Sequence, residues 1–200
     1  MNGLLLLDLD GTVRNTISGD TFIGTNPYDQ KLIKGVLEVA KYYSDKGWFL
    51  VGITNQGGVE KRYKSLENCI EEQRYTLELL PYLDQVYFCP NFKGNICYRV
   101  KKGENDCFKI YNTWASDTHS FRKPGIGMVA QILLDYKIGE QNIPIWMVGD
   151  SDKDRECALN AHINFVWDTV WRTRNQKGLV EVNLSNKKMG LDDLKKFLLT

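Results

Sequence analysis

The stretch Leu4-Leu5-Leu6-Leu7-Asp8-Leu9-Asp10-Gly11-Thr12 sets four consecutive leucines directly before two aspartates. An apolar run without polar alternation is typical of a short strand that is buried on both faces, as in a parallel sheet. The carboxyl end of such a strand is the edge at which open α/β sheets bind ligands. Asp8 and Asp10 are two residues apart, so an extended chain points both to the same side. We therefore expect a reaction centre where this strand ends.

The two aspartates also admit a simpler explanation. Asp-Leu-Asp-Gly is an ordinary polar turn, because Asp and Gly both favour turns. A calcium-binding EF-hand loop fits poorly, since Val13, Arg14 and Asp20 do not supply its alternating oxygen ligands. Two neighbouring carboxylates repel each other unless a cation lies between them or one of them holds a proton. The choice depends on which polar residues accompany them elsewhere in the chain.

Length and composition indicate the general class of protein. The 200 residues, 42% of them hydrophobic, can form one domain with a sizeable core. A net charge of +1 gives no overall field that would attract nucleic acid or a membrane. Five dispersed cysteines, an odd number, indicate free thiols in a reducing compartment, and the leucine run is too short for a signal peptide or a membrane span. We expect a cytoplasmic monomer without a membrane partner.

Strands and helices are expected to alternate along the chain. Apolar and β-branched runs predict strands at 4–7, 48–53, 85–89, 143–148 and 163–167. Apolar residues at helical spacing predict helices within 32–47, 65–80 and 124–136, through Ala158 and Ala161, and at 190–199. Such alternation implies right-handed crossovers and a parallel sheet. The expected fold class is α/β, a doubly wound parallel sheet in three α/β/α layers.

Two stretches interrupt this alternation. Residues 13–25, rich in Thr, Ser and Gly, are predicted to form a short hairpin over the end of the first strand. Residues 90–120 show no periodicity and are predicted to be an irregular insert, which in a compact domain is usually functional or mobile. The chain has no room for a large cap domain. We therefore expect an open site.

Polar residues follow the strands or precede a helix at four places. Because a parallel sheet brings its carboxyl ends to one edge, these residues are expected to lie together. Carboxylates can hold a hard cation, and a hydroxyl with a lysine can hold a phosphate, so the set suits phosphoryl transfer. The four pairs are Asp8 with Asp10, Thr54 with Asn55, Arg122 with Lys123, and Asp150 with Asp154.

These residues, in their order along the chain, resemble the four motifs of the haloacid dehalogenase phosphatase superfamily, subfamily IIIA. The resemblance covers residues 4–168. The matching segments are Asp8-Leu9-Asp10-Gly11-Thr12, Thr54, Lys123 and Gly149-Asp150. The resemblance implies a Rossmann-like core and Mg²⁺-dependent hydrolysis of a phosphomonoester. It implies that Asp8 attacks phosphorus to form an aspartyl-phosphate and that Asp10 acts as general acid and base. Thr54 would donate a hydrogen bond to the phosphoryl oxygens, and Lys123 would neutralise charge.

The resemblance also implies ligand sets. Mg²⁺ would be held by Asp8, Asp150 and the carbonyl of Asp10, with Asp154 in support. Alternatives remain for several of these residues: Lys123 could be a solvated residue before a helix, and Asn55 and Gln56 could only hold their loop in place. The residues expected to contact substrate are Thr12, Arg14, Asn55, Gln56 and Arg122.

Two branches of the family fit the finer detail and differ in substrate. Four segments resemble the 3'-phosphatase of polynucleotide kinase/phosphatase: residues 8–14, residues 16–22, Thr54-Asn55-Gln56 and residues 121–128. The heptose bisphosphate and histidinol phosphate phosphatases resemble Val86-Tyr87-Phe88-Cys89-Pro90 and 147–154. The second branch commonly carries a zinc loop, at positions occupied here by Cys89-Pro90-Asn91 and His119-Ser120-Phe121. At most one ligand of each pair is present, so we expect no zinc, although Cys97 and Cys107 could in principle complete a site.

The first and third motifs, residues 16–19 and the basic, aromatic insert together favour one substrate. Residues 91–123 carry seven Lys or Arg and three Asp or Glu, a local net charge of +4. Such a segment could grip phosphates and stack bases, or its aromatic side chains could pack on the domain. We favour a polynucleotide 3'-phosphate, whose removal leaves a 3'-hydroxyl for DNA repair. The alternatives are a small sugar phosphate and, as a non-enzyme, a phosphate-binding module without turnover. The interleaved aromatic residues are Phe92, Tyr98, Phe108, Tyr111 and Trp114.

Overall fold

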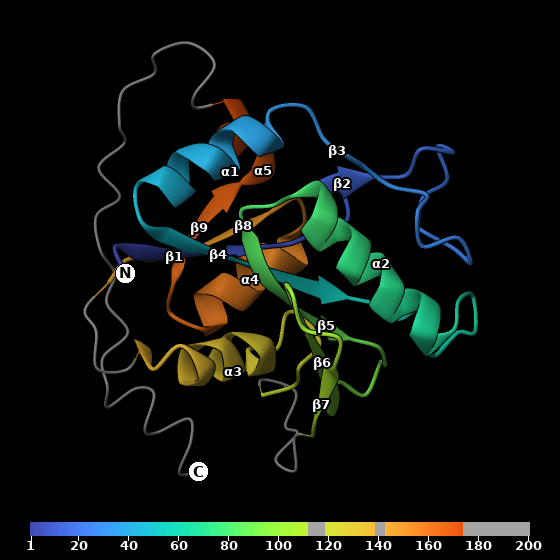
Figure 1. Ribbon diagram of the computed structural model, residues 1–200. Helices are drawn as coiled ribbons and strands as arrows, with labels where there is room; N and C mark the ends of the chain where they lie inside the picture. The colour runs from blue at the N-terminus through green and yellow to red at the C-terminus, as the bar shows by residue number, and fades with distance from the viewer. Residues whose placement is uncertain (112–118, 139–142, 174–200) are drawn as a thin grey trace.

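The first strand lies in the middle of the sheet. The computed structural model describes residues 1–111, 119–138 and 143–173. Seven strands within these ranges form one sheet in the order β7-β6-β5-β4-β1-β8-β9 (Figure 1). β1 pairs in parallel with β4 and β8, β4 with β5, and β8 with β9. The parallel core of the predicted fold is confirmed. Its strands are β1 (Gly3–Leu7), β4 (Trp48–Asn55), β5 (Leu83–Cys89), β8 (Ile145–Gly149) and β9 (Asn164–Trp167).

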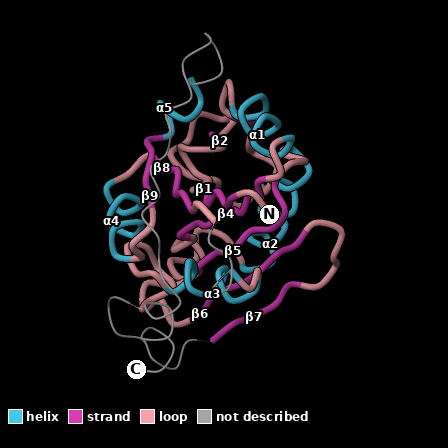
Figure 2. The backbone as a smooth tube through the Cα atoms, turned by 90° about the vertical axis from the view of Figure 1, so that its left-hand side faces the viewer, coloured by secondary structure: helices cyan, strands magenta, loops and turns pink. Residues whose placement is uncertain are grey.

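Helices cover both faces of this sheet, as expected for three layers. Leu4 and Leu6 belong to a core cluster with residues of α3 and α4, whereas Leu5 and Leu7 belong to a second cluster with residues of α1, α2 and α5. Figure 2 shows α3 and α4 on one side of the strands and α1 and α2 on the other. The four leucines lack polar alternation because both faces of β1 are buried. The helices are α1 (Val36–Asp45), α2 (Leu66–Leu79), α3 (Gly127–Asp135), α4 (Asp152–Asn160) and α5 (Asp168–Thr173).

The helices differ from the sequence prediction in small respects. The short helix α5 was not predicted, and α3 starts at Gly127 rather than at Pro124. Among the described residues, no helix combines the length and apolar character that crossing a bilayer requires. The helix expected at 190–199 lies outside the described residues.

The prediction of an irregular insert at 90–120 is wrong for much of that stretch. β6 (Ile96–Lys101) pairs antiparallel with β5, and β7 (Cys107–Tyr111) pairs antiparallel with β6. Neither strand shows a clean alternation, because Cys97 and Tyr98 are both buried and β7 is a largely exposed edge strand. Pairing with β5 therefore specifies these strands more than a local pattern does. Residues 112–118, which include Trp114, lie outside the described residues.

The hairpin predicted at 13–25 is also different in the structure. β2 (Arg14–Asn15) pairs antiparallel with β3 (Lys31–Leu32), and the loop 16–30 connects them. Leu32, which the apolar spacing assigned to a helix, lies in β3, and α1 starts only at Val36, after Gly35 at φ 92°. The chain after β1 thus makes a wide excursion beside the end of the sheet.

Truncation of the central strand tests this core. Leu6 is fully buried, so Leu6→Ala should lower the free energy of unfolding by about 2–5 kcal/mol through lost burial and a cavity. Leu159→Ala is a matched control, because Leu159 on α4 is 56% exposed and its truncation should change stability by less than about 0.5 kcal/mol. Chemical denaturation of both variants measures the difference. Equal losses would contradict the position of Leu6 in the core.

Candidate active site

The ends of β1, β4 and β8 bring the predicted polar residues together. Leu7 pairs with Gly52 of β4 and Val148 of β8, so the residues that follow all three strands meet at one edge. Asp8 continues from β1, and its backbone N–H donates to the carbonyl of Val148 over 2.9 Å. Thr54 lies near the end of β4 and Asp150 directly follows β8. The expected convergence of these groups is present.

Lys123 connects two of the carboxylates. Its Nζ lies 2.5 Å from Oδ1 of Asp8 and 2.6 Å from Oδ1 of Asp154, and it donates to the carbonyl of Ile53 over 3.0 Å. Lys123 is 4% exposed, so it is not the solvated residue of the alternative reading. Burial alone would lower the pKa of Lys123, but Asp8 and Asp154 raise it above its ordinary value. The lysine therefore stays charged between two acids.

Asp8 is buried, and the pKa of its carboxyl group is far from its ordinary value. Burial raises the pKa of Asp8 to about 7, and the charges of Asp154 and Asp10 act in the same direction, while Lys123 opposes them. Burial likewise raises the pKa of Asp150, followed by the charges of Asp154 and Asp168. In both cases the pKa of the carboxyl group rises mainly because burial disfavours the charged form, and the neighbouring negative charges add to the effect.

Three carboxylates could hold a metal ion. Ligand oxygens of Asp8, Asp150 and Asp154 all lie within 4.8 Å of one another, and no other group of this kind occurs among the described residues. An all-oxygen set suits a hard divalent cation, which would offset the crowded charge. The backbone fits tightly here, because a Cβ on Gly11 (φ 87°) would lie 2.1 Å from Oδ2 of Asp150. These residues fit a Mg²⁺-type site.

Asp154 has internal partners in addition to Lys123. Its Oδ2 accepts hydrogen bonds from the hydroxyl of Ser151 over 2.6 Å and from the backbone N–H of Ser151 over 3.2 Å, which caps the start of α4. Burial acts to raise the pKa of Asp154, but Lys123 and Ser151 hold it below its ordinary value. An ionised Asp154 therefore lies beside the lysine.

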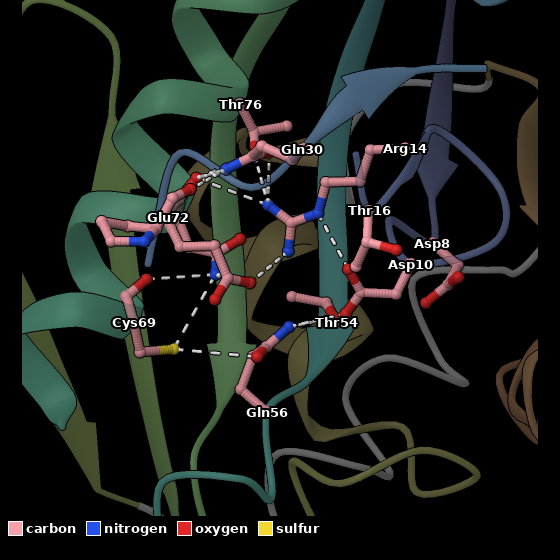
Figure 3. Close-up of polar contacts among 12 residues, drawn as sticks. Asp8, Asp10, Arg14, Thr16, Gln30, Thr54, Gln56, Cys69, Glu72 and Thr76 are labelled. Carbon is pink, nitrogen blue, oxygen red and sulfur yellow. Dashed lines mark hydrogen bonds and ion pairs between the residues drawn. The ribbon is translucent and has the colours of Figure 1, made fainter. Parts of the chain in front are cut away.

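The side chain of Asp10 is turned to a different set of partners. Its Oδ1 accepts from Nε of Arg14 over 2.9 Å and its Oδ2 accepts from Nε2 of Gln56 over 2.9 Å (Figure 3). Nε2 of Gln56 also donates to Oγ1 of Thr54 over 3.1 Å. Burial acts to raise the pKa of Asp10, but the charge and hydrogen bond of Arg14 hold it below its ordinary value. The carboxylate of Asp10 is thus outside the three-carboxylate group, which leaves only its carbonyl for the predicted metal role.

The structure corrects the expectation that Arg14 contacts substrate. Arg14 is fully buried, and all three guanidinium nitrogens have partners inside the protein. Asn55 is also engaged internally: it exchanges two hydrogen bonds of 2.9 and 3.0 Å with the backbone of Lys123. Its geometry matches the loop-holding alternative. Thr12, likewise predicted to contact substrate, is fully buried.

Arg122 remains the most suitable cation for an incoming ligand. Its guanidinium lies 4.4 Å from the ring centroid of Phe92, a half-exposed residue. Nη1 of Arg122 is buried and has no hydrogen-bond partner among the described residues. A cation stacked on an aromatic ring with a nitrogen left over can bind an anionic group.

Sequence reasoning missed two residues close to the site, Lys64 and Glu72. Both are buried, and Glu72 contacts Arg14 behind Asp10. Glu72 belongs to the buried face of α2 together with Cys69 and Leu77. A charged residue on the apolar face of a helix was the signal that could have revealed it.

Two of the three cysteines considered as zinc ligands lie in the core, and Cys107 is half-buried. Cys89 and Cys97 are fully buried, and burial raises the pKa of the Cys89 thiol to about 11. The Sγ of Cys89 donates to the carbonyl of Asn91 over 3.3 Å. The expectation that the protein binds no zinc stays a prediction.

Known proteins of similar sequence are phosphatases. The D-glycero-D-manno-heptose-1,7-bisphosphate 7-phosphatase of Thermosynechococcus vestitus is 30% identical over 138 residues, which are 66% of this chain and 63% of the relative. The D-glycero-beta-D-manno-heptose-1,7-bisphosphate 7-phosphatase of Haemophilus influenzae is 29% identical over 82% of this chain and 79% of the relative. The match to the first relative thus spans less than two thirds of its length.

A solved structure has the same fold. The D,D-heptose 1,7-bisphosphate phosphatase from B. bronchiseptica, complexed with magnesium and phosphate, superposes with a TM-score of 0.56 at 21% identity, over 98% of this chain and 97% of the other. The sequence pattern of the polynucleotide kinase 3 phosphatase family matches residues 4–169. With this match, and with Asp8, Lys123 and Asp150 at one edge of a mostly parallel sheet, the chain belongs to the haloacid dehalogenase superfamily as a phosphatase of subfamily IIIA.

Proposed function

We propose that the protein hydrolyses the phosphomonoester of a small sugar phosphate, of the heptose 1,7-bisphosphate type, through an aspartyl-phosphate on Asp8. One observation carries the catalytic part: the buried carboxylate of Asp8 lies 2.5 Å from Nζ of Lys123 at the end of the central strand. A buried acid that is oriented by a fixed cation suits a carboxylate nucleophile. Asp10 lies two residues further along the same strand end.

Each side chain has a role in the two half-reactions. A carboxylate oxygen of Asp8 attacks phosphorus, and the leaving oxygen departs with a proton from Asp10. Asp10 then takes a proton from water, whose oxygen attacks the aspartyl-phosphate and releases phosphate and free Asp8. Mg²⁺, held by Asp8, Asp150 and the carbonyl of Asp10, would supply positive charge to the phosphoryl oxygens. Lys123 neutralises charge on Asp8 throughout.

Thr54 has a donor left for the phosphoryl group. Its hydroxyl oxygen accepts the hydrogen bond from Gln56 over 3.1 Å, so its own proton is free to point at a phosphoryl oxygen. Preorganised donors of this kind stabilise the charge that develops on a transferred group. Gln56 thereby orients Thr54 and Asp10 together.

The preference for a polynucleotide is not supported, and the sugar phosphate alternative takes its place. The basic residues of β6 and β7 are engaged locally: the guanidinium of Arg99 lies 4.6 Å from the ring centroid of Phe108, and Nζ of Lys109 lies 4.7 Å from that of Tyr111. Tyr98 stacks on a core aromatic residue rather than facing solvent. The two relatives described above act on heptose bisphosphates by name. The charge of Arg99 is also paired with Asp135 and that of Lys101 with Glu104, so β6 offers little unpaired positive charge to a phosphate backbone.

Removal of the nucleophile tests the reaction. Asp8→Asn keeps the shape of the side chain and should lower the hydrolysis of 4-nitrophenyl phosphate by about a thousandfold or more, because the covalent route is lost. Asp45→Asn is the control, since Asp45 is an exposed residue of α1 paired with Lys41. Unchanged turnover in Asp8→Asn would exclude the mechanism. A wild-type protein that binds phosphate without turnover would favour the binding module.

Metal binding should raise the stability of the folded protein. Addition of Mg²⁺ at about one hundred times its Kd should raise the free energy of unfolding by about 2.7 kcal/mol, because the ion binds only the folded state. Asp150→Asn should abolish most of this gain, whereas Asp152→Asn should keep it, since Asp152 lies outside the three-carboxylate group. Thermal unfolding with EDTA and with Mg²⁺ measures both. An equal gain in the two variants would disprove the assigned site.

The substrate proposal is tested by competing phosphomonoesters. We expect kcat/KM for heptose 1,7-bisphosphate to exceed that for a 3'-phosphorylated oligonucleotide by about a hundredfold, or about 2.7 kcal/mol in transition-state binding. Its dependence on salt should be shallow. Histidinol phosphate, assayed in parallel, separates the two small-molecule types. Higher efficiency on the oligonucleotide, with a salt slope of about 0.7 per phosphate contacted on a single strand, would restore the nucleic-acid reading.

A further inference from the structure

A buried ionic chain extends from Asp10 into the protein. We use this term for Asp10, Arg14, Glu72 and Lys64. Nε of Arg14 contacts Oδ1 of Asp10 over 2.9 Å, Nη2 of Arg14 contacts Oε1 of Glu72 over 2.5 Å, and Nζ of Lys64 contacts Oε2 of Glu72. The side chains of Arg14 and Glu72 are fully buried, that of Lys64 is 5% exposed, and that of Asp10 is 34% exposed. The charges alternate, and only the end at Asp10 is substantially exposed.

Polar side chains fix the middle of this chain. Nη1 of Arg14 donates to Oε1 of Gln30 over 3.1 Å and also contacts Oγ1 of Thr76, and Nε2 of Gln73 donates to Oε1 of Glu72 over 3.1 Å. Figure 3 shows Gln30 and Thr76 around the guanidinium of Arg14, beside α2. Arg14 lies in β2 and Glu72 in α2, so the contacts tie the hairpin and the helix to one carboxylate.

Stability alone is a weak reason for such a chain. Taking charges out of water is costly, and apolar residues of similar volume often replace buried ion pairs without loss of stability. The chain does, however, fix both oxygens of Asp10, since Arg14 holds Oδ1 while Gln56 holds Oδ2. Each carboxylate oxygen has a second lone-pair site, so a carboxylate held at both oxygens keeps a defined direction in which to exchange a proton.

We propose that Arg14 and Glu72 are positioning residues, which hold the carboxylate of Asp10 in the orientation that delivers a proton to the leaving oxygen. The proposal rests on the proposed function, because it assigns no role without Asp10 as general acid. Arg14 acts on Asp10 directly, and Glu72 acts through Arg14. Lys64 balances the charge of Glu72 at the inner end.

Leaving-group dependence distinguishes this role from a structural one. A general acid matters most when the leaving oxygen is basic, as in an alkyl phosphate, and least when it is a stable phenolate, as in 2,4-dinitrophenyl phosphate. The ratio kcat/KM reports the steps through formation of the aspartyl-phosphate, in which the leaving group departs. A structural defect lowers kcat/KM for both substrates by the same factor. A misplaced general acid lowers kcat/KM mainly for the alkyl phosphate.

The experiment measures kcat/KM on glycerol 2-phosphate and on 2,4-dinitrophenyl phosphate for the full chain. We expect Glu72→Gln to lower kcat/KM for the alkyl phosphate at least about tenfold more than kcat/KM for the aryl phosphate. Asp10→Asn, which lacks the general acid, should show the same preference for the aryl phosphate. Asp135→Asn is the control: it weakens a contact of 3.1 Å with Arg99 on another part of the protein and should affect both substrates equally.

A paired variant protects the test against misfolding. Glu72→Gln leaves Lys64 buried without its partner, so the double variant Lys64→Met with Glu72→Gln removes both charges together. Equal losses on the two phosphates in a folded variant would overturn the proposal, as would unchanged activity on both. If neither variant folds, the buried ionic chain serves stability alone and the proposal is wrong. Absence of hydrolysis in the wild-type protein would instead refute the proposed function.

Discussion

The contact of Lys123 with Asp8 and Asp154 is the interaction on which the rest of the site depends. One ammonium lies 2.5 Å from the first carboxylate and 2.6 Å from the second, in a region where all three side chains are buried. Without it, two of the three clustered carboxylates would face each other as unpaired buried charges, a strongly unfavourable arrangement. Asn55 secures the backbone of Lys123 to the end of β4 by two hydrogen bonds. The cation therefore joins the ends of β1 and β4 to the first turn of α4.

The position of β1 explains why one strand can organise so many groups. It lies between β4 and β8, so Asp8 has a parallel strand end on each side, which an edge strand would not have. Gly11 then lets the chain turn away at φ 87°, where any side chain would collide with the carboxylate of Asp150. The local backbone is thus shaped by the acid that β8 delivers. Sheet order and turn chemistry specify the same site.

The parts that the sequence predicted correctly are those with a local cause. The leucine run of β1 and the polar residues after β4 and β8 depend on burial and on the direction of parallel strands, and both follow from short patterns. β6 and β7 could not be found in this way, because their pairing with β5 is non-local and the exposed edge strand has no apolar alternation. α5 is a helix of only six residues, which is too short to show a period.

Two arginines near the site show that residue type and sequence position alone do not predict which partner a side chain will have. Arg14 follows the first motif and Arg122 directly precedes Lys123, and the sequence predicted that both contact substrate. α2 places Glu72 opposite Arg14, so that guanidinium is buried between two acids, whereas Arg122 is stacked on Phe92 and keeps a nitrogen without a partner in the described chain. A buried counter-charge thus holds the first arginine inside the protein, whereas the second keeps a nitrogen for which the described residues supply no partner. The acid on the buried face of α2 therefore determines the role of an arginine 58 residues away.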